Sequence, residues 1–215
     1  MRSRSASIPV LAAAAVATSA LHAETVDFVV YSDNAASAAG IQTSAQLSAT
    51  ASAFTLTLSN STSTGYISNF YLENGSATAG LGSATIQNTA GVSFSAGGSP
   101  PTPGGGIHTT AGGAWGGNFF SMSVNSPRPN QNAISGGESL TVVFANNGTF
   151  SLSDFVLALQ NNDIRLVQHY RAFGPDGESA WLSSNFAVVP LPPAAWAGLG
   201  LLGVMGAVRT LRRRA

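Results

Sequence analysis

The sequence predicts an all-β fold, a single antiparallel β-sandwich domain with an apolar segment at each end of the chain. Short segments in which apolar and polar residues alternate recur through the middle of the chain, separated by Gly, Pro, Asn and Ser. Such alternation is typical of half-buried antiparallel strands, and a helical period is rare here. Arginines accompany the uncharged stretches at the two ends, which sets these stretches apart from the domain.

Charged residues are few and unevenly placed in the 215-residue chain. It has no lysine, and six of its nine arginines lie in the two end segments. Residues 24–189 hold all nine acidic residues and three arginines, a net charge of −6. This acidic middle argues against nucleic acid as a partner, because phosphate binding needs a basic face. The chain has no cysteine, so no disulfide supports the fold.

The first element is a predicted secretory signal peptide, residues 1–23. Two arginines precede an apolar, Ala-rich stretch, and the small residue Ala23 stands before Glu24 as the expected cleavage site. Cleavage after Ala20 is the alternative, because the residue two positions before Ala23 is a bulky leucine. A buried N-terminal helix is the competing interpretation, but a helix that is apolar all round would need burial on every side.

Predicted strands follow in the exported domain, residues 24–187. Asn74-Gly75 and Asn147-Gly148 are hairpin signals between such segments. One segment contains residues 154–159, which also fit a short helical turn, and a bulged strand or that turn both stay open. The size suits one domain. The predicted strand segments are 25–31, 53–60, 65–75, 119–124, 138–145, 149–160, 164–173 and 180–188.

A Gly/Pro-rich loop, residues 95–117, interrupts the strands. A loop of this length is either functional or mobile. Trp115 stands in it with no strand pattern to bury the indole. Aromatic faces stack on sugar rings, so Trp115 is the one candidate ligand-binding residue of the domain. The competing interpretation places the aromatic residues in the core, where most of them lie in a sandwich.

No motif in the domain predicts catalysis, a metal or a cofactor. There is no G-x-S-x-G segment and no cysteine nucleophile. His108 and His169 have no acidic neighbour at metal-ligand spacing. A secreted carbohydrate-active enzyme is the rival prediction, and it would need two carboxylates facing each other across a cleft. The acids that could form such a pair are Asp154, Asp163, Asp176 and Glu178.

The last element is a predicted membrane segment, residues 188–215. Its apolar helix is expected at about 193–208, because prolines disrupt the helix before that point. Trp196 suits one membrane interface and the terminal arginines suit the other. The positive-inside rule then puts the C-terminus in the cytoplasm and the domain outside. A single-pass membrane protein that is never processed is the alternative.

The tail resembles the PEP-CTERM sorting signals of Gram-negative bacteria, in the variant with a VPLPA signature. A proline-containing signature, a short glycine-rich apolar helix and an arginine cluster follow one another. Pro193 stands between the signature and the alanine pair, one residue more than the signature has. The region from Ser139 to the tail is also similar to cargo domains that accompany such tails. The matching residues are Val189, Pro190, Leu191, Pro192, Ala194, Ala195, Trp196, Arg209, Arg212, Arg213 and Arg214.

The resemblance implies that an exosortase, a membrane protease, recognises the signature and cleaves near it. The protein would be anchored in the inner membrane and then reach the cell surface or the extracellular matrix. Expected partners are therefore the exosortase and the inner membrane, with extracellular polysaccharide as a further candidate. The resemblance assigns no activity to the domain, which we predict to be non-enzymatic.

Overall fold

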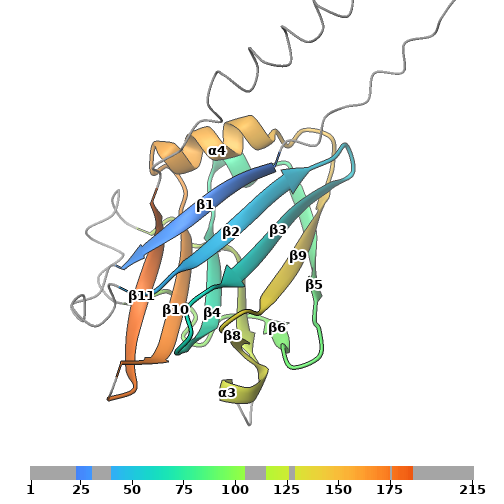
Figure 1. Ribbon diagram of the computed structural model, residues 1–215. Coiled ribbons are helices and arrows are strands. Elements are labelled where there is room, and N and C mark those ends of the chain that lie inside the picture. The colour runs from blue at the N-terminus through green and yellow to red at the C-terminus, as the bar shows by residue number, and fades with distance from the viewer. Residues whose placement is uncertain (1–22, 31–39, 105–114, 126–128, 175, 186–215) are drawn as a thin grey trace, which may run out of the picture.

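The computed structural model describes residues 23–30, 40–104, 115–125, 129–174 and 176–185 of the chain. These residues form one antiparallel sheet of eleven strands, with one nine-residue α-helix at one end of it (Figure 1). The strands are β1 (Ala23–Val30), β2 (Thr43–Ala49), β3 (Ala53–Asn60), β4 (Tyr66–Glu73), β5 (Leu81–Gln87), β6 (Phe94–Ala96), β7 (Asn118–Val124), β8 (Ile134–Ser135), β9 (Ser139–Asn146), β10 (Leu166–Phe173) and β11 (Glu178–Asn185). The helices are η1 (Ser76–Thr78), α3 (Pro129–Asn132) and α4 (Leu152–Gln160).

The sheet rolls up into a nearly closed, barrel-like shape. Its strand order is β5-β9-β3-β2-β1-β11-β10-β4-β7-β6, and β8 adds to β4. The terminal strands β5 and β6 come into contact. Phe119 and Phe120 of β7 also pack on Phe144 of β9, with ring centroids 6.0 and 5.2 Å apart. These contacts join strands that lie close to opposite ends of the strand order, so the sheet curves back on itself.

The predicted all-β fold is therefore confirmed, but the strands form one continuous sheet where a sandwich has two packed sheets. The continuity depends on the first and last strands, because β1 pairs with both β2 and β11. In this way β1 and β11 join the two halves of the strand order. Local sequence patterns carry no information about that pairing, since its partners are about 155 residues apart.

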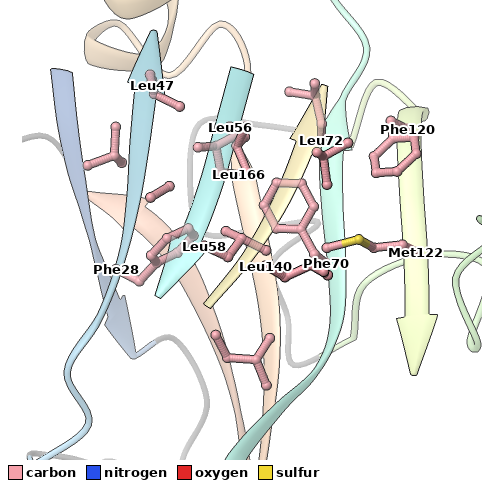
Figure 2. Close-up of a cluster of buried hydrophobic side chains, with 14 of the residues drawn as sticks. Phe28, Leu47, Leu56, Leu58, Phe70, Leu72, Phe120, Met122, Leu140 and Leu166 are labelled. Atoms are coloured by element: carbon pink, nitrogen blue, oxygen red, sulfur yellow. The ribbon is translucent and has the colours of Figure 1, made fainter. Parts of the chain in front are cut away.

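One large core fills the inside of the rolled sheet. Strands β3 and β9 show why: buried residues alternate with less buried ones along both strands, and Phe54, Leu56 and Leu58 of β3 are fully buried. Figure 2 shows such side chains converging from most of the strands. The residues labelled there are Phe28, Leu47, Leu56, Leu58, Phe70, Leu72, Phe120, Met122, Leu140 and Leu166.

Three local predictions were wrong. The strand predicted for residues 149–160 is absent, because residues 152–160 form α4, which agrees with the helical turn left open for 154–159. The hairpin predicted at Asn147-Gly148 is absent for the same reason, since β9 is followed by α4. Ser151 caps α4, since its Oγ accepts a hydrogen bond from the Asp154 backbone N–H at 3.3 Å. Asn74-Gly75 leads into η1, and β4 and β5 do not pair. Gly75 is needed for packing, because a Cβ there would come within 2.4 Å of Ile164 Cγ2.

Candidate functional site

A second, smaller cluster lies on the outside of the sheet, over β4, β10 and β11. Side chains alternate between the two faces of a strand. Tyr71 and Val167 therefore point away from the main core, yet both are fully buried. We call the group on this face the outer-face cluster. Its members are Tyr71, Glu73, Trp115, Arg165, Val167, His169 and Trp181.

Cross-strand pairing brings the rings of this cluster together. Val167 lies opposite Tyr71 on β4, and His169 lies opposite Trp181 on β11. The rings of His169 and Trp181 stack with centroids 4.3 Å apart and an interplanar angle of 7°. Tyr71 also packs on Trp181, at a centroid distance of 5.9 Å. The arrangement follows from strand register, so the sheet itself positions these side chains.

An ion pair between Glu73 and Arg165 forms the charged part of this cluster. Arg165 Nε donates to Glu73 Oε2 at 2.7 Å, and Arg165 Nη2 donates to Glu73 Oε1 at 2.8 Å. The exposed fractions of the two side chains are only 5% and 2% for Glu73 and Arg165, respectively. Glu73 Oε1 also accepts a hydrogen bond from the Gly116 backbone N–H at 2.7 Å. A bidentate ion pair of this kind compensates for the burial of both charges.

Trp115, the candidate ligand-binding residue, packs against this ion pair. The Arg165 guanidinium lies over the indole, 5.2 Å from its centroid, a cation–π contact. Trp115 Nε1 donates to Asn118 Oδ1 at 3.1 Å. The indole is half-buried. Sequence reasoning missed this packing, because Arg165 lies fifty positions further along the chain and no strand pattern includes Trp115.

The Gly/Pro-rich loop is anchored to the sheet at both of its described flanks. Three of its carbonyls, those of Ser99, Pro100 and Pro101, accept hydrogen bonds from sheet side chains. The donors are Asn69 Nδ2 at 2.9 Å, Tyr71 Oη at 2.7 Å and Asn118 Nδ2 at 2.6 Å, in that order. Close packing also needs glycine here, since a Cβ on Gly98 would come within 2.4 Å of the Tyr71 ring. Residues 105–114, with His108, lie outside the described residues.

Burial sets the charge state of two rings of the cluster. Burial, helped by the positive charge of Arg171, lowers the pKa of His169 to about 4. Burial raises the pKa of Tyr71 to about 12. Both rings are therefore neutral near pH 7, and neither changes charge there. A neutral aromatic surface beside a paired arginine is suited to binding by stacking and hydrogen bonding.

The acids named for the rival enzyme divide between two ends of the molecule. Asp154 and Asp163 both line a surface hollow of about 350 Å³ beside α4, and both side chains are exposed. Asp176 lies in the β10–β11 turn and Glu178 is the first residue of β11, roughly 25 Å away along β10 at about 3.3 Å per residue. Within the described ranges, no group of three His, Cys, Asp or Glu side chains could hold a metal ion.

The residues predicted for processing are placed as follows. Ala23, the expected cleavage site, is the first residue of β1. Every residue assigned to the sorting signal, from Val189 to Arg214, lies outside the described residues. In the part of the chain that the structure describes, no helix combines the length and the apolar character needed to cross a membrane.

Comparison with known proteins gives no relative: no family model, no curated protein and no solved structure matches this chain.

Proposed function

We propose that the chain is an exported, non-enzymatic β-protein that a C-terminal sorting signal directs to the cell surface or its polysaccharide matrix. One observation carries the proposal. It is the order of three parts in residues 188–215: the proline signature, the glycine-rich apolar stretch and the arginine cluster. Membrane insertion needs such an apolar stretch, and the arginines give it an orientation. The proposal does not require residues 188–215 to take part in the folded domain.

The fold of the described residues is consistent with a self-contained domain in the middle of the chain. Their eleven strands form one sheet around one large core. The core buries large side chains from both halves of the chain, such as Phe54 and Phe173. On this proposal, we expect the domain to remain folded after both end segments have been removed.

The test is the intact mass and the location of the protein in cells with and without an exosortase. We expect loss of the residues after about Pro190 only when the enzyme is present. Pro190→Ala combined with Pro192→Ala should abolish that loss, while Pro101→Ala, at an exposed proline of the domain, should not. Deletion of Pro193 restores the spacing of the signature and should leave cleavage intact or increase it. A tail that stays uncleaved in both strains contradicts the proposal.

Carbohydrate binding through the outer-face cluster is the second candidate function. The observation in its favour is that Trp115, His169 and Trp181 are half-buried aromatic residues gathered on one face. Such rings leave part of their surface to a sugar. A glycan-array screen should find a ligand that Trp115→Ala no longer binds and that Leu157→Ala, on α4, still binds. Binding that survives Trp115→Ala removes this residue from the candidate site.

A further inference from the structure

A hollow lies where β1 and β2 stop pairing with each other. The ladder between these strands ends at the pair Asp27–Ser44, and the next residues, Phe28 and Thr43, are both described but not paired. The hollow has a volume of about 370 Å³, at the small end of the range of about 300–1,000 Å³ for ligand sites. Its described lining residues are Asp27, Phe28, Ile41, Gln42, Thr43, Ser44 and Ser61.

Hydrogen bonds between β2 and β3 hold the backbone of this lining. Thr43 lies opposite Asn60 in the strand register. Just before that pair, the Ser61 backbone N–H donates to the Gln42 carbonyl at 2.9 Å. The Gln42 backbone N–H in turn donates to Thr62 Oγ1 at 2.7 Å. The bonds use backbone groups of the lining, so its side chains remain available to a ligand.

The polar side chains of the lining have no partners within the part of the chain that the structure describes. The carboxylate of Asp27, the amide of Gln42 and the three hydroxyls make no side-chain hydrogen bond or ion pair there. Thr43 is the most informative of them, because it is only 5% exposed and its Oγ1 is unpartnered. Buried hydroxyls are normally hydrogen-bonded, so this one indicates a partner that enters the hollow.

The chemistry of these groups matches a neutral ligand that is rich in hydroxyls. The hydroxyls and the amide of the lining can both donate and accept hydrogen bonds, and the Asp27 carboxylate accepts them. Sugar hydroxyls also donate and accept, so a sugar can satisfy every one of these groups. Phe28 and Ile41 supply apolar surface for the C–H groups of a sugar ring.

Other classes of ligand fit this lining less well. A calcium ion takes about six to eight oxygen ligands, whereas the described lining offers a single carboxylate. An acidic sugar would bring its own carboxylate beside Asp27, and no arginine is among the described lining residues. The charge of the lining therefore selects against anions.

We propose that this hollow is a binding site for one ring of a neutral saccharide. The exposed Asp27 carboxylate accepts hydrogen bonds from ring hydroxyls at the mouth of the hollow. The Thr43 hydroxyl gains its missing partner at the buried end. The site shares no residue with the outer-face cluster and does not depend on the sorting signal, so it goes beyond the proposed function.

Ligand-observed NMR on the full-length chain tests the site, in a detergent that has no sugar headgroup. The probes are glucose, galactose, mannose and N-acetylglucosamine, with glucuronate as an acidic sugar. We expect at least one neutral sugar to bind, and glucuronate to bind more weakly than that sugar. If no neutral sugar binds, or if glucuronate binds as tightly, the proposal is overturned.

Thr43→Val is the decisive variant, because valine resembles threonine in shape and lacks the hydroxyl. Since that hydroxyl has no partner in the free protein, the substitution should leave the midpoint of urea unfolding unchanged or raise it. It should weaken sugar binding by about threefold to tenfold, as expected for the loss of one hydrogen bond. Asp27→Asn removes a charged acceptor and should weaken binding by about tenfold or more.

Two controls separate this site from general effects and from the outer-face cluster. Thr85→Val makes the same change at an exposed position of β5 and should alter neither stability nor binding. Trp115→Ala should leave the affinity for the sugar unchanged. Binding that Thr43→Val and Asp27→Asn leave unaltered overturns the proposal, whether or not Trp115→Ala removes it. Failure of tail processing in cells would contradict only the proposed function.

Discussion

Arg165 is the bulkiest of the fully buried side chains, and its charge has to be compensated inside the protein. Glu73 supplies the opposite charge, and Trp115 supplies an aromatic face on the guanidinium. The same carboxylate holds the Gly116 backbone N–H, so one ion pair also fixes an end of the Gly/Pro-rich loop. A buried pair of this kind is costly to break, because the remaining partner keeps its charge without solvent.

We therefore expect Glu73→Ala to lower the free energy of unfolding by about 3–5 kcal/mol, the range for one partner removed from a buried ion pair. Asp176→Ala, at an exposed acid, is the matched control and should change it by less than about 0.5 kcal/mol. Urea titration at pH 7 measures both. A loss for Glu73→Ala no larger than that of the control would show that water compensates for Arg165.

His169 predicts a dependence of stability on pH. Its pKa is about 4 in the folded protein and close to 6.5 in an unfolded chain. Between these two values the unfolded state binds more protons, so stability falls as the pH is lowered from about 6.5 towards 4. After allowance for partial exposure of the ring, the effect is on the order of 2 kcal/mol.

The measurement compares the natural chain with His169→Gln by urea titration at pH 7 and at pH 4.5. The natural chain should lose more stability than the variant between pH 7 and pH 4.5. The difference between the two losses gives the contribution of His169, because the carboxylates are the same in both proteins. Equal losses in the two proteins would contradict the assigned pKa.

At the scale of elements, strictly alternating strands could be predicted and weakly apolar ones could not. Strand β3 occupies the predicted residues 53–60, and β7, β9 and β10 begin within two residues of their predicted starts. Strand β2 went unpredicted, because its inward side chains Thr43, Ala45 and Leu47 are small or polar apart from the leucine. Strand β5 carries Gly82 and Ser83, which hide its pattern.

The candidate site was harder to predict than the strands. Trp115 could be singled out because it lies in a loop, but its contact with Arg165 depends on the tertiary fold. Glu73 and Arg165 gave no signal, because 92 positions separate them in the sequence. Only the register of β4 and β10 brings them together.

Helix α4 is held to the sheet by aromatic packing. The ring of Phe155 lies 5.0 Å from Phe54 and 5.6 Å from Phe150. Phe155→Ala should therefore lower the free energy of unfolding by about 3–5 kcal/mol. Leu157→Ala, two residues further along the same helix and half exposed, should cost less than about 1 kcal/mol. Similar losses at the two positions, measured by chemical denaturation, would show that α4 adds little to the core.

For the whole molecule, the main question is whether the outer-face cluster and the sheet unfold together. Trp115 and Trp181 both lie in the cluster, and the third tryptophan, Trp196, lies in the predicted tail. In a chain of residues 24–189, tryptophan fluorescence therefore reports the cluster, while far-UV circular dichroism reports the sheet. Because Tyr71, Val167 and Arg165 belong to sheet strands or border them, we expect the two signals to coincide in one transition. A fluorescence change at lower urea would contradict this.

The pairing of β1 with β11 also constrains the order of events in time. During synthesis the N-terminal part of the chain appears first. Strand β1 is therefore available before the other described strands, and β11 only after them. Until then β1 can pair with β2 alone, and the two halves of the strand order stay unjoined. The domain therefore closes late, because its two halves can be joined only when β11, which ends at Asn185, has been synthesised.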